Sequence, residues 1–445
     1  MDILNKNILV VGLGKSGAAA ARFLKNRGAR VTVTDMAKEE QLEIFASDIR
    51  EMGITLELGF HKPETFQNAD TIVISPGVPH TIPPIRAAQA NGVPVLGEIE
   101  LASRFIREPI VAITGTNGKT TTTQLVGKML EASGGKVFVG GNIGNPLIAY
   151  ADGDEKADVL VIEVSSFQLD TIDRFRPRAA ILLNITEDHL DRYPGFDAYA
   201  KSKARIFENQ QADDFAILNS ANPLVCSHTQ NIKSQKLDIG KGMLQEDGKF
   251  QISDSDFHIS DIILPPAFCH QPHNLENVSA ACLAALALGG TPEGIQSALD
   301  HFEMPRHRLE YVAKIREVMY FDDSKATNPD AVVKALECFD KSVILIMGGR
   351  GKDNDLSVLK AQVRQKVKTL ITIGETKDEI ISVLGCECKG TARTASTMKD
   401  AVSQAYRAAT PGDVVLLSPA CASFDMYNSY AERGDVFCQS VERLR

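Results

Sequence analysis

The stretch with the clearest chemistry is Thr114-Gly-Thr-Asn-Gly-Lys-Thr120, which follows an apolar strand pattern and opens a helical one. Its glycines let backbone amides approach phosphate oxygens, and the start of the helix adds the positive end of a dipole. In such loops the lysine reaches the β- and γ-phosphates and the next hydroxyl joins Mg²⁺. The general pattern has a glycine where this chain has Ile113. Because the other features agree, the stretch predicts a phosphate-binding loop with Lys119 and Thr120 in these roles.

A second glycine pattern, Gly12-x-Gly14-x-x-Gly17, comes directly after the first apolar strand, and Asp35 ends the next strand. This order is typical of a dinucleotide-binding turn, in which the glycines admit a pyrophosphate and the acidic residue binds a ribose hydroxyl. A nucleoside diphosphate without nicotinamide fits equally well, because backbone amides bind any pyrophosphate. Tight packing of a strand against a helix is the alternative explanation of these glycines.

Acidic residues follow two further apolar strands. Glu163 ends the strand 159–162, and the segment Asn184-Ile-Thr-Glu-Asp-His-Leu-Asp191 follows the strand 179–183. Ligands of open α/β sheets bind where the strands end, so Glu163 is placed to bind Mg²⁺ or to position a base. His189 lies among carboxylates and is placed for metal binding or proton transfer. The alternative is that these are solvated side chains at strand ends.

The last third of the chain carries three loops that each follow an apolar strand. Their basic residues predict an anion pocket, because the carboxyl ends of parallel strands share one sheet edge. Basic loop residues are often only solvated, so the argument depends on their clustering. The loops are 322–328, 347–352 and 417–425, and the basic residues are Lys325, Arg350 and Lys352.

Strand and helix patterns alternate along the whole chain, which predicts parallel sheets in α/β domains. Three such series match a length of 445 residues at roughly 150 residues per domain. A polar stretch from about Ser227 to Phe268 departs from the pattern and predicts a β-rich flap. The predicted strands are 7–11, 30–34, 71–75, 110–113, 159–162, 179–183, 319–321, 342–347, 369–373 and 414–417, and the predicted helices include 15–26, 275–288 and one that ends at 132.

The composition excludes several partners. Lys and Arg number 48 against 57 Asp and Glu, a net charge of −9 that disfavours nucleic acid and anionic membranes. The longest apolar run, Ala280–Leu288, has nine residues, whereas a membrane span needs about 18. The N-terminus does not resemble a signal peptide. Eight scattered cysteines without a CxxC pair predict reduced thiols in a cytoplasmic protein, and the absence of heptads predicts a monomer.

Taken together, these motifs resemble the Mur ligases of bacterial cell-wall synthesis over nearly the whole chain. The phosphate loop is shared with folylpolyglutamate synthases, whereas NITEDHLDRY, DDSKATNPDA and SPACASFD point to the Mur ligases that add D-glutamate. The resemblance implies a Rossmann-like domain for a UDP substrate at 1–96, a central P-loop ATPase-like parallel-sheet domain at 97–303, and a Rossmann-like amino-acid-binding domain at 304–445. The other shared motifs are GLGKSG, SPGV, GGNIG, EVSSFQL, KSKARIF, HNLENV, MPRHRLE and GGRGK.

Enzymes of this family activate a carboxylate by phosphoryl transfer from ATP and join the acyl phosphate to an amine. For this chain the resemblance implies ATP, UDP-N-acetylmuramoyl-L-alanine and D-glutamate as substrates, two Mg²⁺ ions, and a role in peptidoglycan precursor synthesis. Both the acceptor carboxylate and the γ-phosphate are anionic, so bringing them together requires positive charge from Mg²⁺ and Lys119. Because the ATP and amino-acid loops lie in different domains, we expect hinge motion near residues 300–306.

The resemblance also implies a carbamylated lysine at Lys203, in the motif KSKARIF. A carbamate would turn a cation into an anion suited to a metal site. Its formation needs a neutral amine, so the surroundings must lower the lysine pKa from about 10.4. Lys201, two residues earlier, would face elsewhere on a helix.

Carried over position by position, the resemblance implies four groups of site residues. The catalytic residues are Lys119, Glu163, His189 and Lys203, and the metal ligands are Thr120, Glu163, His189 and Lys203. The ATP-binding residues are Gly115, Thr116, Asn117, Gly118, Lys119, Thr120, Thr121, Asn274, Arg308 and Asp323. The UDP-substrate residues are Gly14, Lys15, Ser16, Asp35, Gly77, Asn142 and His189. The D-glutamate residues are Lys325, Thr327, Lys352, Ser423, Phe424 and Tyr430.

Other classes of function compete on the residues alone. A nicotinamide-dependent oxidoreductase would use the turn Gly12–Gly17 but leaves the phosphate loop unexplained. A mechanical or regulatory P-loop NTPase predicts a strand that ends in Asp, whereas this one ends in Glu163, and it gives the third-domain basic loops no task. A folate ligase of the same architecture is disfavoured by the nucleotide-binding fold ahead of the phosphate loop.

Overall fold

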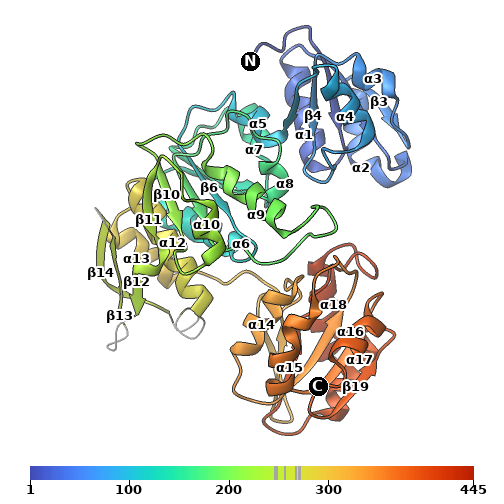
Figure 1. The fold of residues 1–445 in the computed structure, drawn as a ribbon, viewed down its shortest axis with the longest axis vertical. Coiled ribbons are helices and arrows are strands. Elements are labelled where there is room, and N and C mark those ends of the chain that lie inside the picture. The colour runs from blue at the N-terminus through green and yellow to red at the C-terminus, as the bar shows by residue number, and fades with distance from the viewer. Residues whose placement is uncertain (245–248, 255–256, 266–267, 269–271, 445) are drawn as a thin grey trace. The chain divides into compact units, whose positions relative to one another are not determined.

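Helices cover three large sheets in the computed structural model, which describes residues 1–244, 249–254, 257–265, 268 and 272–444 (Figure 1). The described residues form two compact units. The first unit contains those up to Phe302, apart from Thr186–Tyr199 and the pair Pro272–His273. The second unit contains that segment, that pair and the residues from Glu303 on. The predicted domain limits 1–96, 97–303 and 304–445 stay a prediction.

The first sheet has five parallel strands in the order β3-β2-β1-β4-β5. Its central strand β1 pairs with β2 on one side and β4 on the other, and the turn after β1 leads directly into helix α1. The elements are β1 (Asn7–Val11), α1 (Lys15–Asn26), β2 (Arg30–Asp35), α2 (Glu39–Glu51), β3 (Thr55–Leu58), α3 (Pro63–Gln67), β4 (Thr71–Ile74), α4 (Pro83–Ala90) and β5 (Val95–Gly97).

The central sheet has six parallel strands in the order β11-β10-β9-β6-β8-β7. Strand β6 is buried along its whole length, as a strand with helices on both faces must be. The loops after β6, β8 and β9 therefore leave neighbouring strands at one edge. The elements are α5 (Glu98–Ser103), β6 (Ile110–Thr114), α6 (Lys119–Ala132), β7 (Val137–Gly141), α7 (Leu147–Asp152), β8 (Val159–Glu163), α8 (Ser166–Leu169), β9 (Ala179–Leu182), α9 (Phe196–Ala204), β10 (Phe215–Leu218), α10 (Pro223–His228), β11 (Gln235–Asp238), α12 (Pro272–Ala287) and α13 (Pro292–Asp300).

A small antiparallel sheet confirms the predicted β-rich flap. Its strands are β12 (Gly242–Leu244), β13 (Lys249–Asp254) and β14 (Phe257–Ile263), in that order. The connections 245–248 and 255–256 lie outside the described residues.

The third large sheet is mixed, with the order β15-β16-β20-β17-β18-β19. Strand β15 runs antiparallel to β16, while the other pairs are parallel. The hairpin turns at Arg316 and Glu317, whose φ angles of 52° and 62° suit a two-residue primed turn. The elements are β15 (Glu310–Ile315), β16 (Val318–Asp322), α14 (Pro329–Glu337), β17 (Val343–Gly348), α15 (Lys360–Lys366), β18 (Val367–Ile373), α16 (Lys377–Leu384), β19 (Thr391–Thr394), α17 (Met398–Ala408), β20 (Val414–Leu417) and α18 (Tyr430–Glu442).

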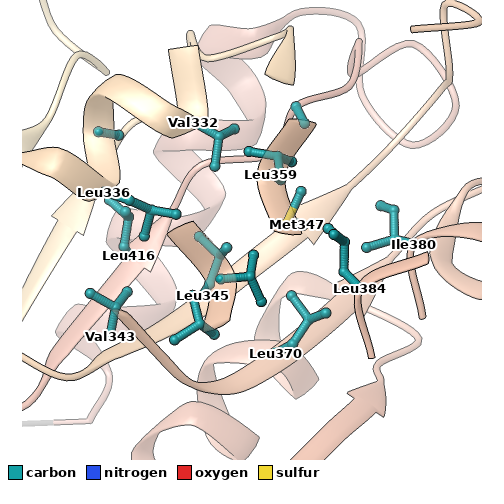
Figure 2. Close-up of a cluster of buried hydrophobic side chains, with 14 of the residues drawn as sticks. Val332, Leu336, Val343, Leu345, Met347, Leu359, Leu370, Ile380, Leu384 and Leu416 are labelled. Carbon is teal, nitrogen blue, oxygen red and sulfur yellow. The ribbon is translucent and has the colours of Figure 1, made fainter. Parts of the chain in front are cut away.

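Both faces of the central strands of this sheet, β17 and β20, are buried. Figure 2 shows one face, where β17 and β18 pack against α14 and α16. Alternate residues of β17, Ile344 and Ile346, belong to the core on the other face. This explains the continuous apolar runs from which the strands were predicted. The labelled side chains in Figure 2 are Val332, Leu336, Val343, Leu345, Met347, Leu359, Leu370, Ile380, Leu384 and Leu416.

Three predictions from the sequence can be compared with the structure. Each predicted strand is present, within two residues at either end. No helix in the described ranges is both long and apolar enough to cross a membrane. The seven described cysteines are free thiols, and Cys269 lies outside the described residues.

Glu98, the first residue of α5, is a buried carboxylate in the first unit. Its Oε1 accepts a hydrogen bond of 2.7 Å from the backbone N–H of Ile148, at the start of α7. Its Oε2 is buried without a hydrogen-bond partner among the described residues. Burial raises the pKa of Glu98 to about 7. The folded chain therefore favours the protonated form of this carboxyl group below about pH 7.

A carboxyl group with a raised pKa stabilises the fold fully below its unfolded pKa and loses that contribution as the pH rises through its folded pKa. We predict that the free energy of unfolding of the wild type, relative to Glu98→Gln, falls by roughly 2 kcal/mol between pH 5 and pH 8. Urea denaturation at both pH values measures this, with the exposed Glu40→Gln as the control for a lost charge. Equal pH dependence in the wild type and Glu98→Gln would contradict the assignment.

Candidate functional site

The phosphate-loop sequence turns between β6 and α6 at the carboxyl edge of the central sheet. Gly115 and Gly118 have φ angles of 153° and 85°, which favour glycine. A Cβ on Gly118 would also collide with Oδ1 of Asn277 on α12. Ile113 is buried inside β6, so the loop begins only at Gly115. This shorter loop explains the departure from the general glycine pattern.

Two lysine ammonium groups converge on one carbonyl of this loop. Lys119 Nζ donates to the carbonyl oxygens of Gly115 and Thr116, both at 2.8 Å, and Lys203 Nζ donates to the Gly115 oxygen, also at 2.8 Å. Lys203 on α9 is only 2% exposed, whereas Lys201 is exposed, as predicted. The loop therefore holds both lysine side chains beside the predicted phosphate site.

Glu163, at the end of β8, connects the phosphate loop to the predicted UDP-substrate residues. Thr120 Oγ1 donates to its Oε2 at 2.8 Å, and Asn142 Nδ2 donates to its Oε1 at 2.9 Å. The hydroxyl and carboxylate oxygens of Thr120 and Glu163 are the hard ligands that Mg²⁺ prefers. Since these two side chains already contact each other, the donor set fits the cation that the resemblance implies.

A cavity of about 490 Å³ lies between the glycine turn after β1 and the loop after β7. It is large enough for a small-molecule ligand. Lys15 Nζ, on one side, donates to the carbonyl oxygen of Gly144 on the other at 2.6 Å. Six of the seven predicted UDP-substrate residues line it, and the seventh, His189, belongs to the second unit. The six are Gly14, Lys15, Ser16, Asp35, Gly77 and Asn142.

The glycine turn is shaped by close packing as well as by ligand access. A Cβ on Gly17 would collide with the carbonyl oxygen of Gly12, so α1 can start against the turn only with glycine there. Asp35 Oδ2 accepts a hydrogen bond of 2.7 Å from the backbone N–H of Leu13. Asp35 therefore orders the turn in addition to lining the cavity.

Two asparagines that support the phosphate loop were not among the predicted site residues. Asn184 Oδ1 accepts from the N–H of Asn117 at 2.9 Å, and its carbonyl oxygen accepts from the N–H of Thr116 at 3.0 Å. Asn277 Oδ1 accepts from Thr122 Oγ1 at 3.3 Å. For Asn184 the sequence did offer an indication, because it opens the loop after β9, next to β6.

Three predicted ATP-binding residues lie far from the loop in sequence. Asn274 is buried on α12, one turn before Asn277. Arg308 and Asp323 belong to the second unit. Asp323 Oδ2 accepts from Ser418 Oγ at 2.8 Å, and burial raises the pKa of Asp323 to about 7.

Four of the six predicted D-glutamate residues form two contacting pairs within the second unit. Lys352 Nζ lies 3.5 Å from Thr327 Oγ1 and 3.1 Å from Asp188 Oδ1. Lys325 Nζ lies 3.9 Å from the centre of the Tyr430 ring, a cation–π contact. The two lysines of the predicted anion pocket thus lie in the loops that follow β16 and β17, at one edge of the sheet.

The remaining predicted residues of this unit differ in exposure. Ser423 is buried, and the side chain of Phe424 is 64% exposed. Arg350 forms an ion pair of 2.9 Å with Glu375, so its charge is already balanced. His189 has a positive φ of 55°, which is uncommon outside glycine. Their roles in binding stay predictions.

Arg433, on α18, links the three loops of this sheet edge and was missed from the sequence. Its Nε and Nη2 donate to Ser324 Oγ at 2.9 Å and to the Ser324 carbonyl oxygen at 2.8 Å. Its Nη1 donates to the carbonyl oxygens of Cys421 at 3.1 Å, Ala422 at 3.3 Å and Gly348 at 3.4 Å. The planar guanidinium group suits this task, because it directs five donors along fixed lines.

No carboxylate lies within ion-pair distance of Arg433 among the described residues. Burial lowers the pKa of Arg433 to about 10, so the side chain remains charged at neutral pH. Its backbone carbonyl partners offset the cost of burying that charge. Arg433 is therefore a buried cation that holds loop backbones in place.

Comparison with known protein families covers all three parts of the chain. Residues 6–97 match the family described as Mur ligase MurD-like, N-terminal domain. Residues 113–285 match the Mur ligase middle domain, and residues 307–421 match the Mur ligase, glutamate ligase domain.

Full-length relatives agree with these matches. A UDP-N-acetylmuramoylalanine–D-glutamate ligase of Desulfosudis oleivorans is 52% identical, over 99% of this chain and 97% of its own. One of Desulfatibacillum aliphaticivorans is 50% identical over 100% of both chains. The solved UDP-N-acetylmuramate-alanine ligase MurC of Thermotoga maritima, at 18% identity, shares the fold with a TM-score of 0.59 over 99% of this chain and 100% of that one. The chain belongs to the Mur ligase family.

Proposed function

We propose that this chain is an ATP-dependent ligase that joins D-glutamate to UDP-N-acetylmuramoyl-L-alanine in peptidoglycan precursor synthesis. The observation that carries the proposal is the hydrogen-bonded chain Thr120–Glu163–Asn142, which runs from the phosphate loop to the cavity after β1. These hydrogen bonds connect the predicted binding site of a triphosphate to the predicted binding site of a second nucleotide substrate. The relatives at 50% and 52% identity support the choice of substrates.

The phosphate loop binds ATP in this proposal. Backbone amides of Gly115–Thr121 contact phosphate oxygens, and Lys119 exchanges its carbonyl partners for the β- and γ-phosphates. Thr120 and Glu163 would hold one Mg²⁺ ion, and His189 with carbamylated Lys203 would help to hold a second. When bound, these ions withdraw charge from the phosphate oxygens.

The reaction proceeds in two steps. The carboxylate of the UDP substrate attacks the γ-phosphorus, the bond to the β–γ bridging oxygen breaks, and ADP leaves behind an acyl phosphate. The neutral amine of D-glutamate then adds to the acyl carbon, inorganic phosphate leaves, and the nitrogen loses a proton. Lys119 balances the charge that two anions bring together in the first step.

Remote binding energy aligns the carboxylate for attack. The cavity lined by Lys15, Ser16 and Asp35 binds the UDP end in this proposal, far from the bond that forms. Asn142 lines the same cavity and bonds Glu163, so it positions the substrate relative to the phosphate loop. Holding the two reactants in line accelerates the reaction because binding has already removed their freedom of motion.

The loops of the second unit bind D-glutamate in this proposal. Lys352 would exchange Asp188 for a substrate carboxylate, and Lys325 stands beside Tyr430 for the other. We also propose that the enzyme acts as a monomer in the cytoplasm, where reducing conditions keep cysteines as thiols like the seven described here.

Substrate selection is the first prediction of this proposal. ATP-dependent phosphate release with UDP-N-acetylmuramoyl-L-alanine is expected with D-glutamate, and not with L-glutamate, L-lysine or no amino acid. Lys119→Ala should lower the rate at least about 100-fold, because charge balance at the γ-phosphate is lost. A phosphate-release assay with each amino acid measures both effects.

Two results would contradict the proposal in different ways. Release with another amino acid would retain the mechanism and reject the assignment of the D-glutamate pocket. Release that does not depend on the UDP substrate would favour a P-loop NTPase.

Carbamylation of Lys203 gives the second prediction. With isotopically labelled bicarbonate, the wild type should show a carbamate carbon resonance that Lys203→Arg lacks, because a guanidinium group does not form this adduct. The Lys203→Arg variant should lose most of its ligase activity. The exposed neighbour supplies the control, since Lys201→Arg should keep both the resonance and the activity. A carbamate resonance that persists in Lys203→Arg would reject this site.

The third prediction concerns Arg433 as a positioning residue. Lys in its place has one nitrogen and cannot reach Ser324, Gly348 and Cys421 together. Arg433→Lys should raise the KM for D-glutamate about tenfold, or about 1.4 kcal/mol, while the KM for ATP changes less than about twofold. Steady-state kinetics measure this split, and the exposed Arg306→Lys is the control. Equal increases in both KM values would indicate general destabilisation instead.

A further inference from the structure

A cavity of about 800 Å³ in the first unit has no task in the proposed reaction. It is lined by the segments that precede β6, β9 and β10, which are neighbouring strands of the central sheet. Because these strands are parallel, their amino ends lie opposite the edge that carries the phosphate loop. Strand β6 has five residues and spans about 16 Å at about 3.3 Å per residue. The cavity is therefore separate from the candidate catalytic site.

The lining of this cavity is rich in arginine. Five arginines and three carboxylates line it, and Arg104 also forms ion pairs with Glu100 and Asp173 beside the lining. Any guanidinium group that such pairs leave available attracts anions on a concave surface, because low-dielectric walls concentrate the field. The five are Arg104, Arg107, Arg174, Arg176 and Arg178.

Two of these arginines are fixed in place. Arg176 Nε lies 2.6 Å from Asp214 Oδ2, and Arg176 Nη2 lies 2.8 Å from Asp213 Oδ1. Arg178 Nη1 lies 2.9 Å from Asp213 Oδ2. The side chain of Asp214 is only 2% exposed, so these ion pairs anchor the arginines to the start of β10. Arg176 and Arg178 therefore occupy fixed positions in the wall of the cavity.

Two other arginines of the cavity, Arg107 and Arg174, are not anchored by ion pairs of this kind. Arg107 is exposed, and its guanidinium group makes no hydrogen bond or ion pair within the described part of the chain. The Arg174 side chain is 79% exposed and reaches only Asp173, at 3.5 Å. Burial alternates from Arg174 to Arg178: Phe175 and Pro177 are buried, whereas Arg174 and Arg176 are exposed and Arg178 is half-buried. Two guanidinium groups thus remain available to a ligand.

We propose that this cavity binds a small molecule that carries two or more phosphate groups. Arg107 and Arg174 would contact the phosphates above the ordered pair Arg176 and Arg178, since guanidinium groups bind phosphate in bidentate fashion. The volume lies within the usual range of small-molecule sites. Ile106 contributes apolar surface for the remainder of the molecule.

Calorimetric titration with inorganic tripolyphosphate tests the proposal. The titration uses Lys119→Ala as the parent protein, so that the phosphate loop does not dominate binding. We expect the parent to bind one equivalent, and Arg107→Ala/Arg174→Ala in that background to bind at least about tenfold more weakly. The control pair Arg86→Ala/Arg407→Ala removes the same charge from exposed sites elsewhere and should bind like the parent.

Each result of these titrations either supports or overturns the proposal. Inorganic phosphate should bind the parent much more weakly than tripolyphosphate if several arginines share one polyanion. Absence of tripolyphosphate binding to the parent, or equal affinity in the Arg107→Ala/Arg174→Ala variant, would overturn the proposal. Ligase activity does not enter the measurement, so its result is independent of the proposed function.

Discussion

Parallel strands force the loops that do chemistry to one edge of each sheet, and the candidate site depends on this constraint. Crossover helices cover both faces, so the carboxyl ends of the strands are where polar loops can meet a ligand. In the central sheet, β6 leads into Gly115, β8 ends at Glu163, and β9 leads into Asn184. The sheet order places these three strands side by side. Distant segments of the chain thereby meet at the predicted phosphate site.

Backbone carbonyl oxygens hold basic side chains in place in both units. Lys119 and Lys203 both donate to the Gly115 oxygen, which fixes the two side chains beside the predicted phosphate site. Arg433 follows the same principle in the second unit, where five hydrogen bonds reach a side chain and carbonyls of three loops. Because these carbonyl oxygens are only partly negative, they hold Arg433 in place without neutralising its charge.

The strands that could be predicted from the sequence are those with both faces buried. Strands such as β6 and β17 are continuous apolar runs, and their pattern needs no knowledge of neighbours. Edge strands lack this pattern, and β19 (Thr391–Thr394) has three exposed residues of four. Strand β16 was predicted, but β15 and the hairpin turn were missed, because Arg316 and Glu317 make the turn without the usual Asn or Gly. The apolar pattern of a strand and the residues of its turns therefore determined which elements could be predicted from the sequence.

The candidate site shows a similar division. Loop residues such as Lys119 and Glu163 could be predicted because their motif and strand-end position carry the chemistry by themselves. Arg433 could not, because nothing local distinguishes one arginine in a helix from a solvated one. Its role arises only when α18 is placed behind three loops that are far apart in sequence. Residues proposed to touch a ligand can thus be predicted from motifs, whereas residues that hold such loops in place can be recognised only from tertiary contacts.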